Sequence, residues 1–416
     1  MNLDMKFIGK KARTASLERI SSIAKNKVLT KYISLIEQEK KLILKENAKD
    51  VKFAINKKLK KNLIDRLILD QKKLNLIKKS IKKIIKLKDP INIILEKWKQ
   101  PNGLKINKVS IPIGVIGVIY ESRPNVTSDV ASLCFKSGNA VILKGGSEAI
   151  YTNKILAKLF QKALILNKVN KNFVSFVDSK NRKTVDYILS EMKEFIDVII
   201  PRGGKNLVKR VNHLSRIPVI GHLEGLCHTF VDKDAELNMA INVIHNAKLR
   251  NTSICGATET ILIHKKIIKK FCSPILRKLA LNNCKIYADS ISKKYYNGRV
   301  YTAKKKDWST EYLSPIISVK CVKSCTDAIN HINKYGTMHT DSIITKNKVT
   351  AKKFLKGVKS SIAMHNTSTQ FADGGEFGFG GEVGISTNTL PPRGPVGLKQ
   401  LISYKYEVSS KGKIRK

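Results

Sequence analysis

The chain has 416 residues, 42% of them hydrophobic, so two domains with cores of ordinary size are expected. No run of about 18 apolar residues is present, which argues against a membrane span, and the basic start lacks the apolar segment of a secretory signal. The seven cysteines are odd in number and irregularly spaced, without a zinc-site pattern. We therefore expect a cytoplasmic protein with free thiols and no membrane partner.

The formal net charge of +47 has two interpretations. A basic surface attracts nucleic-acid phosphates, which makes a nucleic-acid binder one hypothesis. The excess is almost all lysine, however, in a chain also rich in Ile and Asn, and it is scattered over helix faces without interleaved aromatic residues. No nucleic-acid-binding motif is present, so we favour a general residue bias and expect no specific nucleic-acid partner. Such a field would still steer anionic substrates.

The predicted elements begin with lysine-rich amphipathic helices over residues 1–95, as in 62–87, where Leu and Ile recur at three- and four-residue spacing. Asn102-Gly103 is a strong hairpin signal and predicts paired strands over 97–112. The β-branched apolar run 111–122 predicts one buried strand. Strands and helices then alternate, with strands at 139–146, 173–178 and 197–204 and helices at 148–166, 183–193 and 205–214.

A second alternation starts near residue 226 and predicts another α/β half. It has strands at 226–232, 258–264, 316–322, 341–345 and 360–366 and helices at 234–249, 324–335 and 348–357. This rhythm is typical of parallel, doubly wound sheets with helices on both faces. A further strand near 400–407 is expected at the end of the chain.

Ligands of doubly wound sheets lie beyond the carboxyl ends of the strands. The residues expected there include Lys144-Gly145-Gly146, Asp178 and Arg202-Gly203-Gly204, a set that suits a phosphate-bearing nucleotide. The glycine-rich stretch 374–384 lacks the spacing of a dinucleotide fingerprint. Within it, Glu376 is either a ribose ligand or an exposed loop carboxylate.

Cys255 is surrounded by small polar residues, unlike a cysteine that packs in a core. Such surroundings leave room for a substrate carbonyl at the thiolate, although many intracellular cysteines are inert. Asn125 follows a predicted buried strand and is either an oxyanion donor or a helix cap. His339 and Asp341 either act together as a general base or are simply polar residues of a turn. His222 and His228, six residues apart, do not predict a metal site.

Several stretches together resemble the gamma-glutamyl phosphate reductase family of the aldehyde dehydrogenase superfamily. They are "IPIGVIGVIYESRPNVTSDVASLCFKSGNAVILKGG", "VIIPRGG", "NAK" before "SICGATETILI", "AINHINKYGTMHTDSIIT" and "FADGGEFGFGGEVGIST" with "RGPVGL". They occur in the family's order, and the resemblance runs from about residue 5 to 405.

The resemblance implies an aldehyde dehydrogenase-like α/β fold, with two doubly wound domains and a small β oligomerisation element. By this interpretation residues 1–225 bind NADPH, with hairpin 97–112 in the oligomerisation element. Residues 226–366 form the catalytic domain, and residues 367–416 return with a cofactor loop and the last oligomerisation strand. The implied activity is that of a glutamate-5-semialdehyde dehydrogenase. It reduces L-glutamate 5-phosphate to L-glutamate 5-semialdehyde and phosphate in L-proline biosynthesis. A homo-oligomer is expected, and glutamate 5-kinase is a candidate partner; whether that kinase hands over the substrate stays open.

Site residues follow from the same resemblance. Cys255 corresponds to the nucleophile, which would form a thioester, and Asn125 to an oxyanion-hole asparagine. The residues that correspond to cofactor contacts are Lys144, Gly146, Arg202, Gly203, Gly204, Glu376 and Phe377. Arg123 and Arg393 are hypothetical ligands of the substrate phosphate, because arginine binds phosphate bidentately. No resident metal is implied.

Two departures from the family keep a rival hypothesis open. Gly256 stands where many relatives have asparagine, and Glu224 lies near where hydrolytic aldehyde dehydrogenases keep a water-activating glutamate. The rival is an NAD-dependent enzyme that oxidises aldehydes hydrolytically with Glu224 as the base. Phosphate dependence of aldehyde oxidation distinguishes the two, since only acyl-phosphate chemistry requires phosphate.

Overall fold

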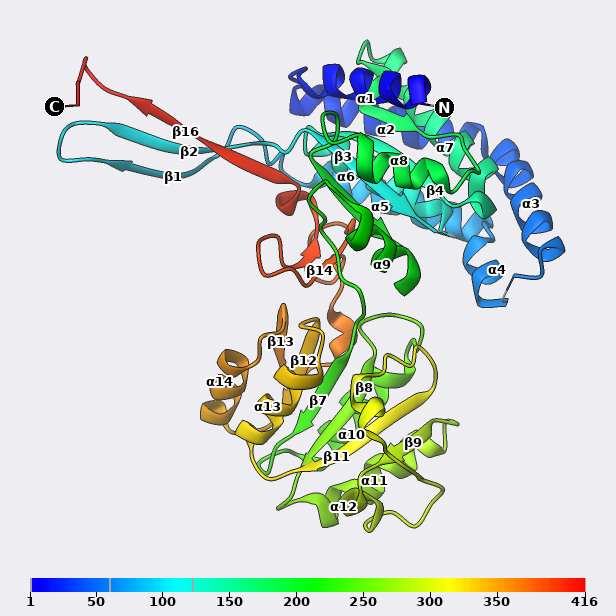
Figure 1. Cartoon of the computed structure of the whole chain (residues 1–416), viewed down its shortest axis with the longest axis vertical. Helices are drawn as coiled ribbons and strands as arrows, with labels where there is room; N and C mark the ends of the chain where they lie inside the picture. Colours follow the sequence, from blue (N-terminus) through cyan, green and yellow to red (C-terminus); the bar gives the residue numbers. More distant parts are fainter. Residues whose placement is uncertain (1, 60, 122, 416) are drawn as a thin grey trace. The chain divides into compact units, whose positions relative to one another are not determined.

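The structure, a computed structural model, describes residues 2–59, 61–121 and 123–415 (Figure 1). The chain forms two compact units. The first contains Met1–Gly221, Gly378–Gly384 and Val396–Lys416, and the second contains His222–Phe377 and Ile385–Pro395. The chain enters the second unit at residue 222, whereas the sequence placed the start of the second domain at residue 226. Two later segments, 378–384 and 396–416, return to the first unit.

The first unit opens with helices, as predicted. In α5 the buried residues Leu74, Ile77, Ile81 and Ile84 recur at three- and four-residue spacing and so line one face of the helix. The Asp70 side chain accepts a hydrogen bond from the Lys73 N–H and caps the helix start. The five helices are α1 (Asn2–Ser16), α2 (Ser22–Gln38), α3 (Lys40–Asn56), α4 (Lys61–Leu67) and α5 (Gln71–Lys86).

A four-stranded parallel sheet of order β5-β4-β3-β6 forms the centre of the first unit. Its strands are β3 (Val115–Tyr120), β4 (Ala140–Gly145), β5 (Val174–Phe176) and β6 (Val198–Arg202). Its helices are α6 (Pro124–Lys136), α7 (Ile150–Leu166), α8 (Lys183–Glu191) and α9 (Lys205–Leu214). This alternation confirms the predicted parallel α/β sheet.

The prediction of one strand over 111–122 was wrong. Gly114 has a φ of +130°, a conformation open to glycine but not to β-branched residues, so the extended chain breaks there. The residues before the break form the last part of β2 (Lys105–Pro112). The residues after it form β3 of the parallel sheet. One apolar run therefore serves two different sheets.

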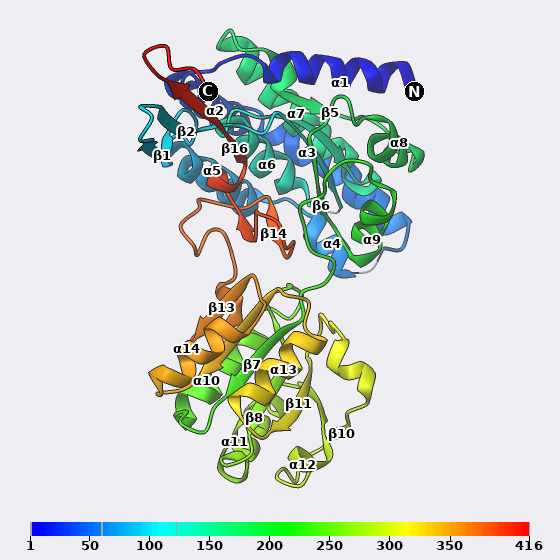
Figure 2. The ribbon, with the colours of Figure 1, turned by 60° about the vertical axis from the view of Figure 1, so that its left-hand side comes forward.

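A second sheet of the first unit is antiparallel, with the order β1-β2-β16. The Asn102-Gly103 turn joins β1 (Ile94–Lys99) to β2, and β16 (Ile402–Ser409) pairs along the other side of β2. All of β1 is exposed, and so is β16 apart from its first residue. This sheet extends away from the rest of its unit in Figure 1, and Figure 2 turns its side of the unit toward the viewer.

The second unit is built on a seven-stranded parallel sheet of order β10-β9-β11-β8-β7-β12-β13. Its strands are β7 (Cys227–Val231), β8 (Thr258–His264), β9 (Lys285–Ala288), β10 (Tyr301–Thr302), β11 (Ile316–Val322), β12 (Thr340–Ile344) and β13 (Ile362–His365). Its helices are α10 (Leu237–Leu249), α11 (Ile268–Ala280), α12 (Ser290–Lys293), α13 (Cys325–Tyr335) and α14 (Lys348–Gly357). The elements α11, β9, α12 and β10 had no counterpart in the sequence prediction.

Helices cover both faces of this sheet with separate cores. Residues of α10 and α11 pack in one apolar cluster, and residues of α13 and α14 pack in another. The prediction of two doubly wound α/β domains with a small β element is thereby confirmed. Short strands β14 (Gly384–Ser386) and β15 (Gly394–Val396) pair with each other near the end of the chain. Among the described helices, none combines the length and apolarity needed to cross a bilayer.

Candidate active site

Cys255 lies in the loop between α10 and β8, and its side chain is partly exposed. The thiol of Cys227 donates to the Cys255 carbonyl at 3.1 Å, and the Ala257 N–H donates to the Ile254 carbonyl at 3.0 Å. Gly225 approaches so closely that a Cβ there would stand 2.3 Å from the Cys255 Cβ. Contacts on both sides therefore hold the loop.

The other six cysteines are buried, among the residues that the structure describes. Burial raises the pKa of each of these thiols, to about 12 for Cys272 and Cys284 and to about 11 for Cys325. The same holds for Cys134, Cys227 and Cys321. A thiol that stays protonated and has no access to solvent is a poor nucleophile. Among the described cysteines, Cys255 is thus the one whose thiol is partly open to solvent.

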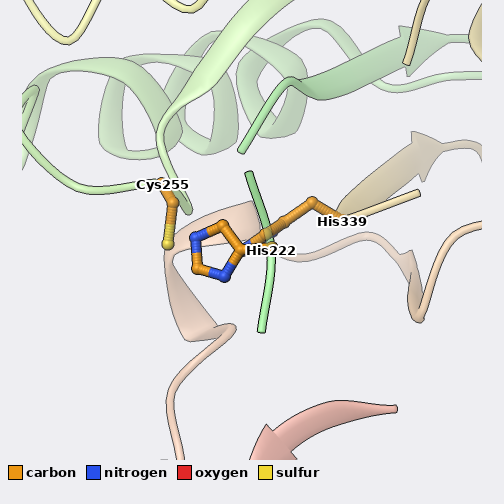
Figure 3. A group of neighbouring side chains, drawn as sticks. All are labelled: His222, Cys255 and His339. Atoms are coloured by element: carbon orange, nitrogen blue, oxygen red, sulfur yellow. The ribbon is translucent and has the colours of Figure 1, made fainter. Parts of the chain in front are cut away.

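Two histidines stand beside this thiol. The ligand atoms of His222, Cys255 and His339 lie within 4.8 Å of one another, and Figure 3 shows the three side chains converging. The two imidazole rings are 4.9 Å apart and nearly perpendicular. His222 is partly exposed, whereas His339 is fully buried.

The strand order explains this convergence. Cys255 precedes β8, His222 precedes β7 and His339 directly precedes β12, and these three parallel strands are neighbours in the order β8-β7-β12. The amino ends of neighbouring parallel strands meet at one edge of the sheet. The sequence hypothesis considered His339 only with Asp341, and nothing local to the sequence indicates this grouping.

Hydrogen bonds fix both rings. His222 donates from Nδ1 to the Ile385 carbonyl at 2.7 Å, since a carbonyl can only accept. The Nδ1 of His339 lies 2.9 Å from the Thr340 hydroxyl and 3.6 Å from the Cys227 sulfur. Its Nε2 is buried and has no hydrogen-bond partner within the described part of the chain.

Asp341 and His228 form a separate pair. The Nδ1 and the backbone N–H of His228 both donate to one carboxylate oxygen of Asp341 at 2.8 Å, and Ser360 donates to the other oxygen. Both members of the pair are buried. Asp341 is therefore engaged with His228 and Ser360 and does not pair with His339.

A buried ion pair that the sequence did not predict joins the two ends of the Cys255 loop. Lys248 in the last turn of α10 lies 2.5 Å from Glu259 in β8, and both side chains have at most 1% exposure. The Leu313 N–H also donates to Glu259 at 3.2 Å. Burial raises the pKa of Glu259 to about 7, although the Lys248 ammonium opposes this shift. No local pattern marks the lysine of the "NAK" stretch before the cysteine as buried.

The predicted cofactor residues of the first unit lie at the carboxyl ends of β4 and β6. Lys144 is buried and donates from Nζ to the Gly145 carbonyl at 2.8 Å, and burial lowers the pKa of its ammonium. Gly146 precedes the short helical turn Ser147–Ala149.

Glu121, directly after β3, accepts a hydrogen bond at 2.8 Å from the N–H of Gly204, the residue before α9. A Cβ on Gly203 would stand 2.5 Å from the Glu121 carboxylate and 2.6 Å from the Leu207 side chain, so any larger residue would require these side chains to move. Arg202 lies 3.9 Å from Glu382, and its Nε is buried without a hydrogen-bond partner in the described chain.

Asn125 and Arg123 lie at the start of α6. Asn125 is exposed and donates from its amide to Asp129 at 3.1 Å, one helical turn on. Arg123 occupies the position just before the helix without a side-chain cap bond. The structure thus places Asn125 within the first turn of the helix, with its amide at the surface.

Three further predicted residues belong to the second unit. Glu376 and Phe377 are exposed in the glycine-rich loop, and the Phe377 N–H donates to the Asp373 carbonyl. Glu376 lines a hollow of about 490 Å³ together with residues of α10 and of the segment 366–371. Arg393 is exposed and donates to the Lys359 carbonyl at 2.7 Å.

Comparison with known proteins defines the class first. The sequence profile of the aldehyde dehydrogenase family matches residues 9–286 and 299–401. The fold is also shared with an acetylating aldehyde dehydrogenase from Geobacillus thermoglucosidasius, with a TM-score of 0.71 at 14% identity, over 100% of this chain and 98% of the other. The chain thus has the aldehyde dehydrogenase fold and matches the profile of that family over most of its length.

Closer relatives narrow this class. The gamma-glutamyl phosphate reductase of Parvibaculum lavamentivorans is 43% identical over 100% of this chain and 98% of its own, and that of Bartonella tribocorum is 45% identical over 98% and 100%. The crystal structure of gamma-glutamyl phosphate reductase from Thermotoga maritima superposes with a TM-score of 0.96 at 38% identity, over 100% of both chains. The chain belongs to the gamma-glutamyl phosphate reductases of the aldehyde dehydrogenase family.

Proposed function

We propose that this protein reduces L-glutamate 5-phosphate to L-glutamate 5-semialdehyde and phosphate with NADPH, in L-proline biosynthesis, through a thioester on Cys255. The observation that carries the proposal is the partly exposed thiol of Cys255 beside two imidazoles, in a chain whose full-length relatives are named for this reduction. The acyl phosphate is unstable in water, which is the reason to expect a glutamate 5-kinase as the source of the substrate.

The chain's own residues need to supply a nucleophile, a proton acceptor, donors to the oxyanion and ligands of the phosphate. The Cys255 thiolate attacks the acyl carbon, and phosphate leaves without help from an activated water, because an acyl phosphate already has a good leaving group. Neighbouring imidazoles can take up the thiol proton. The Cys255 N–H and the Asn125 amide would donate to the oxygen that becomes negative in each tetrahedral intermediate. Arg123 and Arg393 stay the candidate ligands of the leaving phosphate.

The carboxyl edge of the four-stranded sheet fits a phosphate-bearing nucleotide. In the order β5-β4-β3-β6, the chain runs from β3 to one side and returns on the other, which makes β3 and β6 the switch point where such sheets bind ligands. Gly203 permits a close backbone approach there, and Lys144 and Arg202 supply positive charge. Glu376 and Phe377 would contact the nicotinamide ribose side. NADPH, when bound, supplies the two electrons for reduction.

We expect Lys144→Ala to raise the Michaelis constant for NADPH by roughly 10- to 100-fold with little change in kcat, the size of a lost charge-assisted hydrogen bond. Steady-state kinetics with varied NADPH measures this. Lys158→Ala is the matched control, because that lysine is exposed in α7. Circular dichroism must show that the Lys144 variant folds. An unchanged Michaelis constant in a folded variant would remove Lys144 from the cofactor site.

One assay tests the function as a whole. Glutamate semialdehyde is supplied with NADP⁺, and NADPH formation is followed with and without inorganic phosphate. The acyl-phosphate reaction, run in reverse, requires phosphate as the acceptor of the acyl group. Rapid oxidation without phosphate would instead support the hydrolytic rival, and Glu224→Gln should then abolish it. No turnover under either condition would contradict both.

We also propose that the antiparallel sheet mediates self-association. Both of its outer strands are edges, whose unpaired backbone groups invite pairing. Trp98, Tyr404 and Tyr406 are exposed on these strands although aromatic side chains usually gain from burial. An exposed aromatic edge of this kind is typical of a surface that a second copy covers.

Tyr406→Lys is expected to weaken the oligomer by roughly 10- to 100-fold in dissociation constant, because burial of one aromatic side chain contributes about 1.5–3 kcal/mol. Sedimentation velocity over a concentration series measures the change. Leu281→Lys serves as control, since Leu281 is a similarly exposed apolar residue of the second unit. A wild-type protein that sediments as a monomer at all concentrations would overturn the proposal.

A further inference from the structure

The three side chains around the proposed nucleophile also form a set of metal ligands. Cys255, His222 and His339 offer one sulfur and two imidazole nitrogens, all within 4.8 Å of one another (Figure 3). A tetrahedral zinc ion with bonds of 2.0–2.3 Å would hold such atoms about 3.3–3.6 Å apart. Small side-chain movements therefore suffice to close the three ligands around one ion.

The hydrogen bonds around the rings prepare them for this role. The Ile385 carbonyl accepts a hydrogen bond from Nδ1 of His222, which fixes the orientation of this ring. Metal-binding histidines usually make such a bond from their other ring nitrogen, because it fixes the tautomer and the ring plane. The fold thus supplies an outer partner for His222 from the segment 385–395.

His339 adds an independent observation. This residue is completely buried, and its Nε2 has no hydrogen-bond partner within the described chain. Its Nδ1 lies 2.9 Å from the Thr340 hydroxyl, to which it can donate. Buried polar atoms are nearly always paired, and one that is not requires an explanation. A cation bound by the His339 ring at this nitrogen would satisfy it.

We propose that His222, Cys255 and His339 form an inhibitory site for a thiophilic divalent cation, with Zn²⁺ as the best match. A thiolate with two imidazoles is a donor set that zinc favours over Mg²⁺ or Ca²⁺. Three protein ligands leave one coordination position for water. The inhibitory effect, unlike the binding itself, rests on the proposed function. The ion takes the sulfur lone pair that Cys255 needs to attack an acyl group. Zinc binding and acylation of Cys255 therefore exclude each other.

Direct metal binding tests the site without any turnover. The full-length protein, freed of metal with a chelator, is titrated with Zn²⁺ against a chromophoric chelator, and with Co²⁺ as a spectroscopic probe. One equivalent of zinc is expected to bind, and cobalt should show the charge-transfer band of a thiolate ligand and tetrahedral visible bands. Cys255→Ser and His222→Ala are each expected to weaken zinc binding by more than about 100-fold, beyond the usual loss from an outer partner.

Two variants control for other thiols and imidazoles. Cys284→Ala removes a buried thiol elsewhere in the second unit, and His213→Ala removes an exposed histidine of α9. Both should bind zinc as the wild type does. His339→Gln serves as a third ligand variant only if its thermal unfolding matches that of the wild type. Absence of zinc binding in the wild type, or equal binding in Cys255→Ser, would overturn the site.

The activity assay separates this inference from the proposed function. In the phosphate-dependent assay, zinc should inhibit the wild type, and a chelator should restore the rate. If zinc binds at Cys255 but the metal-free protein has no reductase activity, the proposed function fails and the metal site stands. If the metal-free protein is active and binds no zinc, the metal site fails alone.

Discussion

Cys255→Ala is expected to lower the rate of acyl-phosphate reduction by at least about 10⁴-fold, the usual size of losing a covalent nucleophile. Cys255 is the partly exposed thiol of the described chain, while burial keeps the other six protonated. No neighbouring thiol can therefore replace it. The measurement is NADPH oxidation with freshly generated glutamyl phosphate.

Two variants sharpen this test. Cys255→Ser keeps the shape of the side chain but replaces the thiol by a hydroxyl that hardly ionises, so it should lose nearly as much activity as alanine. Cys284→Ala should keep wild-type activity, because burial raises the pKa of the Cys284 thiol to about 12. A Cys255→Ala protein that reduces the acyl phosphate at nearly the wild-type rate would contradict the covalent mechanism.

The thioester itself can be trapped. With glutamate semialdehyde and NADP⁺ but without phosphate, the acyl group has no acceptor and should accumulate on Cys255. Intact-mass spectrometry then detects one acyl group per chain in the wild type and in Cys284→Ala, and none in Cys255→Ser. Acylation of a different residue would redirect the mechanism to that residue.

The second large effect concerns the Lys248–Glu259 pair that joins the ends of the Cys255 loop. Glu259→Leu leaves the Lys248 ammonium buried without its counter-charge, which is expected to destabilise the second unit by about 3–5 kcal/mol. Urea unfolding followed by fluorescence measures the free energy of unfolding. Lys233→Met is the matched control, because its ion pair with Asp234 is exposed and should contribute about 0–1 kcal/mol.

The reverse change gives a pH dependence with a definite sign. Burial raises the pKa of Glu259 from 4.5 to about 7, so the native state keeps a proton that the unfolded state releases. The contribution of Glu259 to stability is therefore present below pH 4.5 and is lost as the pH rises through 7. The Lys248 ammonium lowers the pKa of Glu259, so Lys248→Met should raise this pKa further. The loss of stability that accompanies ionisation of Glu259 then continues to higher pH in the variant.

Lys248→Met should consequently approach wild-type stability at acidic pH and fall progressively behind it above neutrality. Unfolding at a series of pH values between roughly 5 and 9 checks this. A stability difference that stays constant over the range would contradict the assignment of Glu259 as the group that titrates. The double variant Lys248→Met/Glu259→Leu, which leaves no charge behind, should lose less than Glu259→Leu alone.

Much of this protein follows from local sequence. Alternating apolar strands and amphipathic helices predicted both parallel sheets, because side-chain periodicity reports which faces are buried. Lys144, Arg202 and Gly204 could be placed at one sheet edge from sequence, since right-handed crossovers bring the carboxyl ends of parallel strands together. The small polar neighbours of Cys255 likewise indicated an accessible thiol. The strand break at Gly114 escaped detection, because the residues on both sides of it are equally apolar.

Tertiary structure alone decided what surrounds that thiol. His222 and His339 lie beside Cys255 because β8, β7 and β12 are neighbours, and strand order is a property of long-range packing that no local pattern encodes. The burial of Lys248 against Glu259 has the same origin, since a lysine in an amphipathic helix is ordinarily solvated. Sequence thus indicated most of the elements and the accessible thiol, and the packing of distant strands determined the chemical neighbours of that thiol.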